Sequence, residues 1–292
     1  MQTEFSLPLH AQGDSDKFSV SQMASIERAT VAISDREEAV LIISGYWHVP
    51  EHYSRVISQL QDKGIRVICE CLPTIRNLSP PHKTMHDDIQ FIKDIVAREV
   101  EAKTLLTVVC HSYGGMVASA ALGDFALTVG HSADKGGVTA IVYLSAFVPH
   151  ENESLAGMFG GKLPAFMELR QDQTCGAFDP AAAFFGDLSA EDSEWATRLY
   201  VAGCPVSPML SPIPGNDVAW RSIPSAYIVC ENDVALPPKV QRDMIARARE
   251  QGIRFDEYSV QADHSPFINK PGEITEIIVN VMQSVSLRTA CM

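Results

Sequence analysis

Long apolar segments and a basic N-terminus are both missing from this chain. None of its 292 residues fall in an uninterrupted apolar stretch of about eighteen, the length that would cross a bilayer as a helix. The opening MQTEFSLPLHAQGDSDK has neither the positive start nor the apolar centre of a signal peptide. We therefore expect no membrane association and a cytoplasmic location.

Positive charge is also scarce. The chain has 23 Lys and Arg residues against 36 Asp and Glu residues, for a net charge of -13. No local cluster of basic residues reverses a field that repels phosphate backbones, which argues against nucleic acid as a partner. We expect a small-molecule substrate instead, and a homodimer is an assembly that the sequence permits.

Cysteine occurs in an odd number and without a metal-binding pattern. The seven cysteines are scattered, and several lie in apolar, strand-like runs, which is typical of free thiols in a reducing compartment. Cys69 and Cys71 have no second pair to complete a zinc site. His82 and His86 are four residues apart, a spacing that could bind a metal if both lay on one helix. The helix expected here begins after an N-cap at Thr84, so His82 lies outside the helix and a metal site is disfavoured. We expect neither a metal nor a cofactor.

Alternating apolar runs and amphipathic segments dominate what is present. AVLIIS, IRVICE, TLLTVVC, GVTAIVYL, SAYIVCE and RFDEYSV read as strands, and segments with apolar residues at helical spacing separate most of them. Thr84, with Asp87 three residues later, predicts a capping box at the start of one such helix. This alternation predicts an α/β fold with a mostly parallel central sheet and helices on both faces.

The alternation divides the chain into four segments. Residues 1–37 form an N-terminal extension with a short helix expected in SVSQMASIERAT. The core occupies residues 38–149 and 222–292. Residues 150–221 lack a clear strand and are rich in aromatic residues and Met, so we interpret them as a mainly helical lid or cap insertion that forms an apolar pocket.

Ser112 lies where a predicted strand gives way to a helix, in CHSYGG. A sharp turn there would lift its hydroxyl above the sheet edge, provided the residues two before and two after are small. Gly114 meets this need, while Cys110 replaces the usual first glycine and should pack beneath the turn. The amides of the following helix point at any anion formed on Ser112. His111 is expected to be packed rather than reactive.

A reactive serine needs a base and an acid that orients the base. His264, in QADHSPFINKP, follows the last predicted strand, and Asp233, in CENDVALPP, follows the strand before it. Parallel strands end at one sheet edge, which would bring these side chains to Ser112. Glu231 and Asp217 are alternative acids, whereas Asp263 adjoins His264 too closely to reach its ring.

These motifs resemble those of α/β-hydrolases, in particular single-domain, esterase-like members of fungi and bacteria that are related to plant methyl esterases. The resemblance extends from about Val40 to Val285 through SGYWHVPEHY, CHSYGG, WRSIPSAYIVCENDVALPP and ADHSPFINKP. It implies a Ser–Asp–His catalytic triad and an oxyanion hole. The hole would use the backbone amide of Tyr113 and a second amide from Tyr46 or Trp47, after a Ser-Gly opening that departs from the common His-Gly.

Four further residues are expected near the substrate. Trp47 and His48 follow the first strand, and Phe159 and Phe185 belong to the aromatic insertion. A structural hydrogen bond is an equally good explanation for His48.

The identity of the expected nucleophile, Ser112, limits the reactions that the resemblance allows. Dehalogenases and epoxide hydrolases of the family use an aspartate at the position of Ser112, and the related hydroxynitrile lyases carry lysine where Ser265 follows His264. The resemblance therefore implies a serine hydrolase that cleaves a small, largely apolar carboxylic ester, thioester or lactone through an acyl-enzyme. The alternatives are a lyase, acyltransferase or cyclase of secondary metabolism and, in another class, a small-molecule receptor.

Overall fold

The computed structural model describes residues 36–76, 82–127, 135–215 and 217–290, with side chains as far as residue 285. The helix expected in the N-terminal extension lies outside these residues. Within the described ranges, no helix combines the length and the apolar character needed to span a bilayer.

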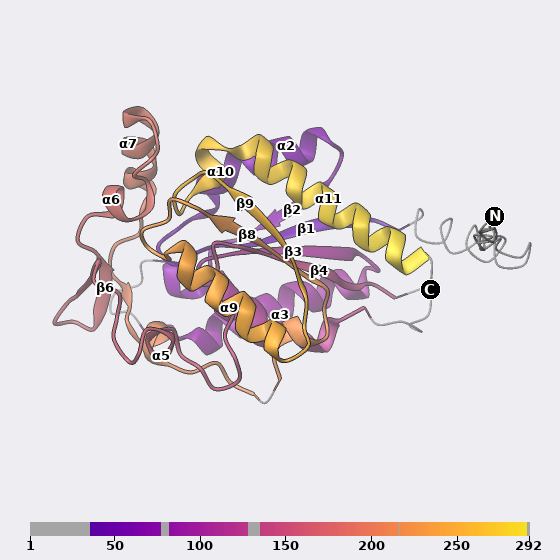
Figure 1. Ribbon diagram of the computed structural model, residues 1–292, viewed down its shortest axis with the longest axis horizontal. Helices are drawn as coiled ribbons and strands as arrows, with labels where there is room; N and C mark the ends of the chain where they lie inside the picture. Colours follow the sequence, from indigo (N-terminus) through magenta and orange to yellow (C-terminus); the bar gives the residue numbers. More distant parts are fainter. Residues whose placement is uncertain (1–35, 77–81, 128–134, 216, 291–292) are drawn as a thin grey trace, which may run out of the picture.

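One parallel sheet forms the centre of the molecule (Figure 1). Its six strands lie in the order β2-β1-β3-β4-β8-β9, and every neighbouring pair is parallel. The strands are β1 (Glu38–Ile43), β2 (Arg66–Cys69), β3 (Leu105–His111), β4 (Gly137–Leu144), β8 (Ser225–Cys230) and β9 (Phe255–Val260). All residues of β3 are buried, which explains why the strands appear in the sequence as continuous apolar runs.

Helices cover both faces of this sheet, which confirms the predicted fold class. In Figure 1, α2 (Ser54–Asp62) and α11 (Pro271–Ala290) lie on one face, while α3 (Met85–Glu101) and α9 (Pro238–Glu250) lie on the other. The short helix α10 (Pro266–Asn269) precedes α11, and α4 (Gly114–Ala121) packs beside α3.

The start of α3 follows the predicted capping box. Thr84 is the N-cap, and Asp87 accepts a hydrogen bond from the Thr84 backbone N–H at 2.9 Å. This pairing satisfies an amide that the helix itself leaves free. Short 3₁₀ helices also belong to the core: η1 (Pro50–Tyr53), η2 (Pro73–Ile75), η3 (Gly123–Phe125) and η4 (Ala219–Arg221).

The insertion between β4 and β8 contains strands that the sequence did not reveal. A second, antiparallel sheet has the order β5-β6-β7. It consists of β5 (Met167–Leu169), β6 (Thr174–Ala177) and β7 (Cys204–Pro205), alongside the helices α5 (Leu155–Met158), α6 (Pro180–Phe184), α7 (Ala190–Leu199) and α8 (Ser207–Leu210). The expectation that this segment lacks strands is wrong, because strands of two to four residues are too short to show an alternating pattern.

Candidate active site

Ser112 occupies a tight turn between β3 and α4. Its φ of 51° lies in the left-handed region, which a non-glycine residue adopts only under local constraint. The two glycines that follow Tyr113 have no room for a side chain. A Cβ on Gly114 would lie 2.5 Å from the Ile43 carbonyl oxygen, and one on Gly115 would lie 2.1 Å from that of Phe147. The glycines let α4 start directly behind the Ser112 hydroxyl.

Cys110 is packed beneath this turn, as the sequence predicts. Its side chain is fully buried, and the thiol donates to the carbonyl oxygen of Val142 at 3.7 Å. Burial raises the pKa of the Cys110 thiol well above its usual value, so the group stays protonated. Cys110 therefore acts as a small packing residue.

His111 is likewise buried, in a chain of hydrogen bonds behind the turn. The Gly45 backbone N–H donates to the Tyr53 hydroxyl at 2.9 Å, and that hydroxyl lies 2.9 Å from His111 Nδ1. His111 Nε2 lies 2.9 Å from the carbonyl oxygen of His264. Burial lowers the pKa of His111, so its neutral ring links the loop after β1 to the loop that carries His264.

The structure brings Ser112, Asp233 and His264 together. His264 Nε2 lies 2.9 Å from Ser112 Oγ, and His264 Nδ1 lies 2.8 Å from Asp233 Oδ2. The side chains of His264 and Asp233 are buried, which strengthens the electrostatic coupling between them. The two distances are those of a nucleophile, a base and an orienting acid in hydrogen-bond contact.

Asp233 is held by its own loop after β8. Its Oδ1 accepts hydrogen bonds from the backbone N–H groups of Ala235 and Leu236, at 2.9 and 2.8 Å. Gln241, a fully buried residue of α9, donates from Nε2 to Asp233 Oδ2 at 3.3 Å. These donors fix the carboxylate and leave Oδ2 facing His264.

The alternative acids lie in other contacts. Glu231 pairs with Arg242 at 2.5 Å, and Asp217 accepts a hydrogen bond from the Val218 backbone N–H at 2.9 Å. The geometry therefore places Asp233, and neither of these two, beside the His264 ring.

Ser145 contacts Asp233 and His264, and sequence reasoning missed it. It follows β4, is fully buried and has a φ of 42°. Its hydroxyl donates to Asp233 Oδ2 and lies 3.3 Å from His264 Nδ1. Only the pairing of β4 between β3 and β8 brings this serine to the triad, and the surrounding LSAFVP has no motif that signals it.

The residues predicted for the oxyanion hole line the same inner cavity as Ser112. This cavity has a volume of about 20 Å³. It is lined by Tyr46, Trp47, Ser112, Tyr113, Phe147, Leu155, Pro164, Phe166, Met167, Phe184, Met209, Ala235, Leu236 and His264. The Tyr46 hydroxyl donates to the Pro205 carbonyl oxygen at 2.6 Å. The Trp47 ring N–H donates to the Cys175 carbonyl oxygen at 3.1 Å. These bonds anchor the loop after β1 to the small second sheet.

Tyr113 is anchored by a buried carboxyl group on α3. Its hydroxyl donates to Asp88 Oδ2 at 2.9 Å, and the Thr74 hydroxyl donates to the same oxygen at 2.7 Å. Burial raises the pKa of Asp88 to about 7 despite these donors. Asp88 was also missed from the sequence, where it appears as one more acidic residue in the first turn of a helix.

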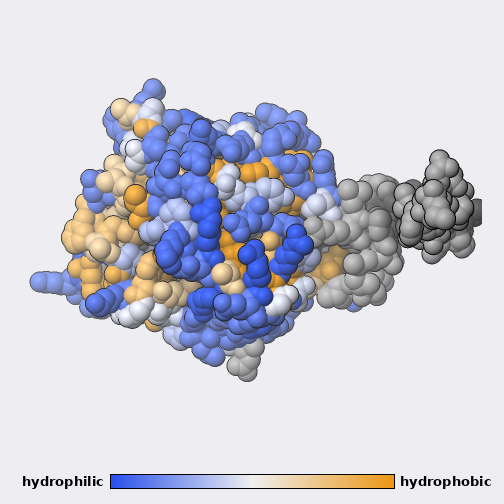
Figure 2. All heavy atoms as spheres, in the orientation of Figure 1, coloured by the Kyte–Doolittle hydropathy of each residue, from blue (hydrophilic) through white to orange (hydrophobic). Residues whose placement is uncertain are grey.

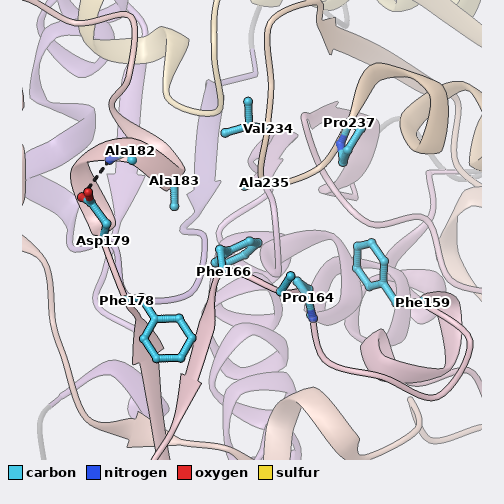
Figure 3. A pocket seen from close by; sticks show the side chains of 11 residues that line it. Phe159, Pro164, Phe166, Phe178, Asp179, Ala182, Ala183, Val234, Ala235 and Pro237 are labelled. Atoms are coloured by element: carbon cyan, nitrogen blue, oxygen red, sulfur yellow. Dashed lines mark hydrogen bonds between the residues drawn. The ribbon is translucent and has the colours of Figure 1, made fainter.

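An outer cavity of about 590 Å³ adjoins the inner one (Figure 3). Phe159 lines this outer cavity, and Trp47 lines the inner one. His48 and Phe185 are buried and line neither cavity. His48 Nδ1 lies 2.8 Å from the Tyr46 carbonyl oxygen, and Phe185 stacks on the His52 ring at 5.9 Å between centroids. The structural alternative for His48 thus matches its contacts.

The insertion is joined to the catalytic loop through two aspartates. The Asp187 backbone N–H donates to Asp263 Oδ2 at 3.1 Å, and the Asp263 backbone N–H donates to Asp187 Oδ2 at 2.8 Å. Burial, with the nearby Asp187 carboxyl, raises the pKa of Asp263 to about 7. Asp263 therefore binds the loop of His264 to the insertion rather than acting on the ring.

The chain is similar to known proteins in sequence and in fold. An alpha/beta hydrolase of Aspergillus novofumigatus, nvfD, is 28% identical over 247 residues, which cover 83% of this chain and 95% of the relative. Methylesterase 7 of Arabidopsis thaliana is 26% identical over 268 residues, which cover 85% of this chain and 97% of the relative. The crystal structure of a pyrethroid hydrolase from Sphingobium faniae has a TM-score of 0.65 at 22% identity and covers 85% of this chain and 98% of its own.

The family assignment rests on a match across most of the core. The sequence profile of the alpha/beta hydrolase family matches residues 40–277, a range that includes the turn at Ser112 and the loops of Asp233 and His264. With its parallel sheet and a serine at the strand-to-helix turn, this chain belongs to the alpha/beta hydrolase family.

Proposed function

We propose that the protein hydrolyses a small, largely apolar carboxylic ester, thioester or lactone through an acyl-enzyme on Ser112. One observation carries this proposal: Ser112 Oγ lies 2.9 Å from His264 Nε2, whose ring contacts Asp233 through Nδ1 at 2.8 Å. Relatives named as a methylesterase and as a carbendazim hydrolyzing esterase support the choice of ester chemistry.

The proposed reaction uses these two contacts of the His264 ring. His264 Nε2 takes the Ser112 proton as the oxygen attacks the substrate carbonyl carbon, and Asp233 stabilises the imidazolium. His264 then gives the proton to the leaving alcohol or thiol, which leaves the acyl group on Ser112. Water, deprotonated by His264, then attacks this acyl group, and His264 returns the proton to Ser112 Oγ as the acid is released.

Backbone amides of Tyr113 and Tyr46 are the proposed donors to the carbonyl oxygen. Tyr113 follows the nucleophile directly, and the Tyr46 and Tyr113 rings pack edge-on at 4.8 Å between centroids. Both hydroxyls have partners elsewhere, Pro205 for Tyr46 and Asp88 for Tyr113, which keeps the rings from turning. Each such amide typically contributes about a hundredfold or more to the rate, because the donor is fixed before charge develops.

Ser112→Ala tests this function. We expect kcat/KM for activated short-chain esters to fall by at least about a thousandfold, since the nucleophile is removed while the fold remains. A fluorophosphonate should label the native protein at Ser112 and leave Ser112→Ala unlabelled. Cys110→Ala is the matched control, two residues away, and should keep both labelling and turnover. Undiminished ester turnover in Ser112→Ala would refute the proposal.

A further inference from the structure

The inner cavity at Ser112 and the outer cavity that adjoins it differ greatly in size. The inner cavity, about 20 Å³, has room for about one water molecule, whereas the outer cavity, about 590 Å³, lies in the range of sites that hold drug-sized molecules. Pro164, Phe166 and Ala235 line both cavities and so form the wall between them. In Figure 3, the Phe166 ring lies between Ala183 and Pro164, below Ala235.

Phe166 is the largest residue of this wall, and packing contacts and a backbone hydrogen bond hold it in place. Its ring packs edge-on against Phe184 at 5.3 Å and against Trp47 at 6.4 Å between centroids. Its carbonyl oxygen accepts a hydrogen bond from the Phe178 backbone N–H at 3.0 Å. The ring therefore bounds both cavities, and an ester held at Ser112 must pass beside it to reach the outer cavity.

The lining of the outer cavity is almost entirely apolar. Its residues are Phe159, Pro164, Ala165, Phe166, Phe178, Asp179, Ala182, Ala183, Val234, Ala235 and Pro237. Phe178 and Val234 are 70% and 64% exposed, so the cavity reaches the surface between them. Figure 2 shows apolar residues gathered at the surface over this end of the molecule, near β6 and α5.

The single charge in this lining is negative. Asp179 Oδ1 accepts a hydrogen bond from the Ala182 backbone N–H at 3.0 Å and caps α6. Among the described residues that line either cavity, none is lysine or arginine. Together with the net charge of -13, this lining disfavours anionic groups such as carboxylates and phosphates.

We propose that the outer cavity binds the larger side of the ester, a neutral apolar group such as a fused aromatic ring, while the inner cavity admits only a methyl-sized group on the other side. This inference rests on the proposed function and narrows it. It disfavours coenzyme-bound thioesters, which carry several phosphate charges, and esters that are bulky on both sides.

Three neutral probes test the size of the two sides. 2-Naphthyl acetate is large on the alcohol side, methyl 2-naphthoate is large on the acyl side, and 2,2,2-trifluoroethyl acetate is small on both. Ala182→Trp places a large ring in the outer cavity from the exposed side of α6. We expect kcat/KM for a naphthyl ester to fall about tenfold relative to the small ester, because the variant fills the space its ring needs. The naphthyl ester that responds identifies which side the cavity binds.

Ala190→Trp is the matched control, because Ala190 is also exposed in the insertion but lies outside both cavities. It should leave all three kcat/KM values at those of the native protein. If Ala182→Trp changes neither naphthyl ester relative to the small one, the outer cavity is not the binding site. If Ser112→Ala hydrolyses the small ester as fast as the native protein, the proposed function fails instead, so the two failures are distinguishable.

Phe166→Ala tests the wall by a gain of activity. The native protein should hydrolyse 2-naphthyl 2-naphthoate poorly, because one of its rings must enter the inner cavity. Removing the Phe166 ring enlarges the inner cavity at its boundary with the outer one, and we expect kcat/KM for this ester to rise about tenfold relative to methyl 2-naphthoate. Native turnover of the two-sided ester equal to that of the methyl ester would overturn the proposed size limit.

Asp179→Asn tests the preference for neutral groups, since asparagine keeps the cap on α6 and removes the charge. The native protein should prefer 2-naphthyl acetate to its 6-carboxylate derivative. We expect the variant to narrow this preference by about twofold, a small factor because Asp179 is exposed to solvent. A native preference for the carboxylate would contradict the inference.

Discussion

The sheet and the insertion solve different structural problems in one chain. The strands β1, β3, β4 and β8 of the sheet are buried along most of their length. The strands β3, β8 and β9 end at the loops that carry Ser112, Asp233 and His264. The insertion has shorter elements, and Leu169, Phe178 and Leu210 are exposed there. The sheet brings Ser112, Asp233 and His264 to within hydrogen-bond distances of one another, whereas the insertion supplies most of the lining of the outer cavity. Under the proposed function, a change of substrate would therefore require changes mainly in the insertion.

Adding one methyl group to each region is the strongest test of this contrast. Gly115→Ala places a Cβ 2.1 Å from the Phe147 carbonyl oxygen, so the backbone must move. We expect the free energy of unfolding to fall by about 3 kcal/mol. In Gly157→Ala, on α5, the nearest atom to the new Cβ is the Ser154 hydroxyl oxygen at 3.1 Å. There the change should stay within about 0.5 kcal/mol, because alanine also favours the helix. Urea unfolding measures both, and equal losses would remove the contrast.

The next test concerns Ser145, which follows β4 and whose hydroxyl contacts Asp233 and His264. Ser145→Ala removes a donor to Asp233, and we expect kcat to fall about tenfold, the equivalent of one hydrogen bond to a charged group. More of the carboxylate charge then faces the His264 ring, so the acid limb of the pH profile of kcat/KM should move to higher pH.

Ser119→Ala is the control for Ser145. Ser119 is also buried, but its hydroxyl pairs with that of Tyr143 at 2.9 Å, away from the triad. A merely structural loss would lower the stability of both variants and leave both pH profiles in place. An unmoved acid limb in Ser145→Ala would show that this serine does not tune the triad.

The junction of the two regions gives the smallest effect. Asp263 has a pKa of about 7, above its ordinary 3.8, so the folded protein binds this proton more tightly than the unfolded chain. Stability from this group is therefore complete below about pH 4 and declines as the pH rises to about 7. Asp187→Asn removes one cause of the raised pKa, and we expect this decline to shrink by about 1 kcal/mol.

Urea unfolding at several pH values measures this effect. Asp243→Asn, which removes an exposed carboxylate paired with Lys239 on α9, is the control and should keep the native pH dependence. If the free energy of unfolding of Asp187→Asn falls with rising pH as much as that of the native protein, the carboxyl pair does not couple the insertion to the loop of His264.

The sequence predicts the sheet region far better than the insertion. Continuous apolar runs mark buried parallel strands, and the capping box at Thr84 and Asp87 marks a helix start to the residue. The order of Ser112, Asp233 and His264, each following a strand, was enough to predict that they meet, because parallel strands end at one edge.

Contacts set by tertiary packing could not be predicted in this way. Ser145 and Asp88 meet their partners only because of the strand order and the packing of α3, and no local pattern marks either residue. The loop position of His48 predicts either a substrate contact or a structural hydrogen bond, and the structure turns its ring toward the Tyr46 carbonyl oxygen. Side-chain direction in an irregular loop depends on neighbours that are distant in sequence.

The burial of Cys110 has a consequence for chemical labelling and oxidation. Only thiolates react readily with alkylating agents and peroxides, and burial raises the pKa of this thiol far above neutrality. The other described cysteines have raised pKa values as well, with Cys69 at about 12. Iodoacetamide should therefore leave turnover intact at neutral pH, and fluorophosphonate probes used beside it would report on the serine alone.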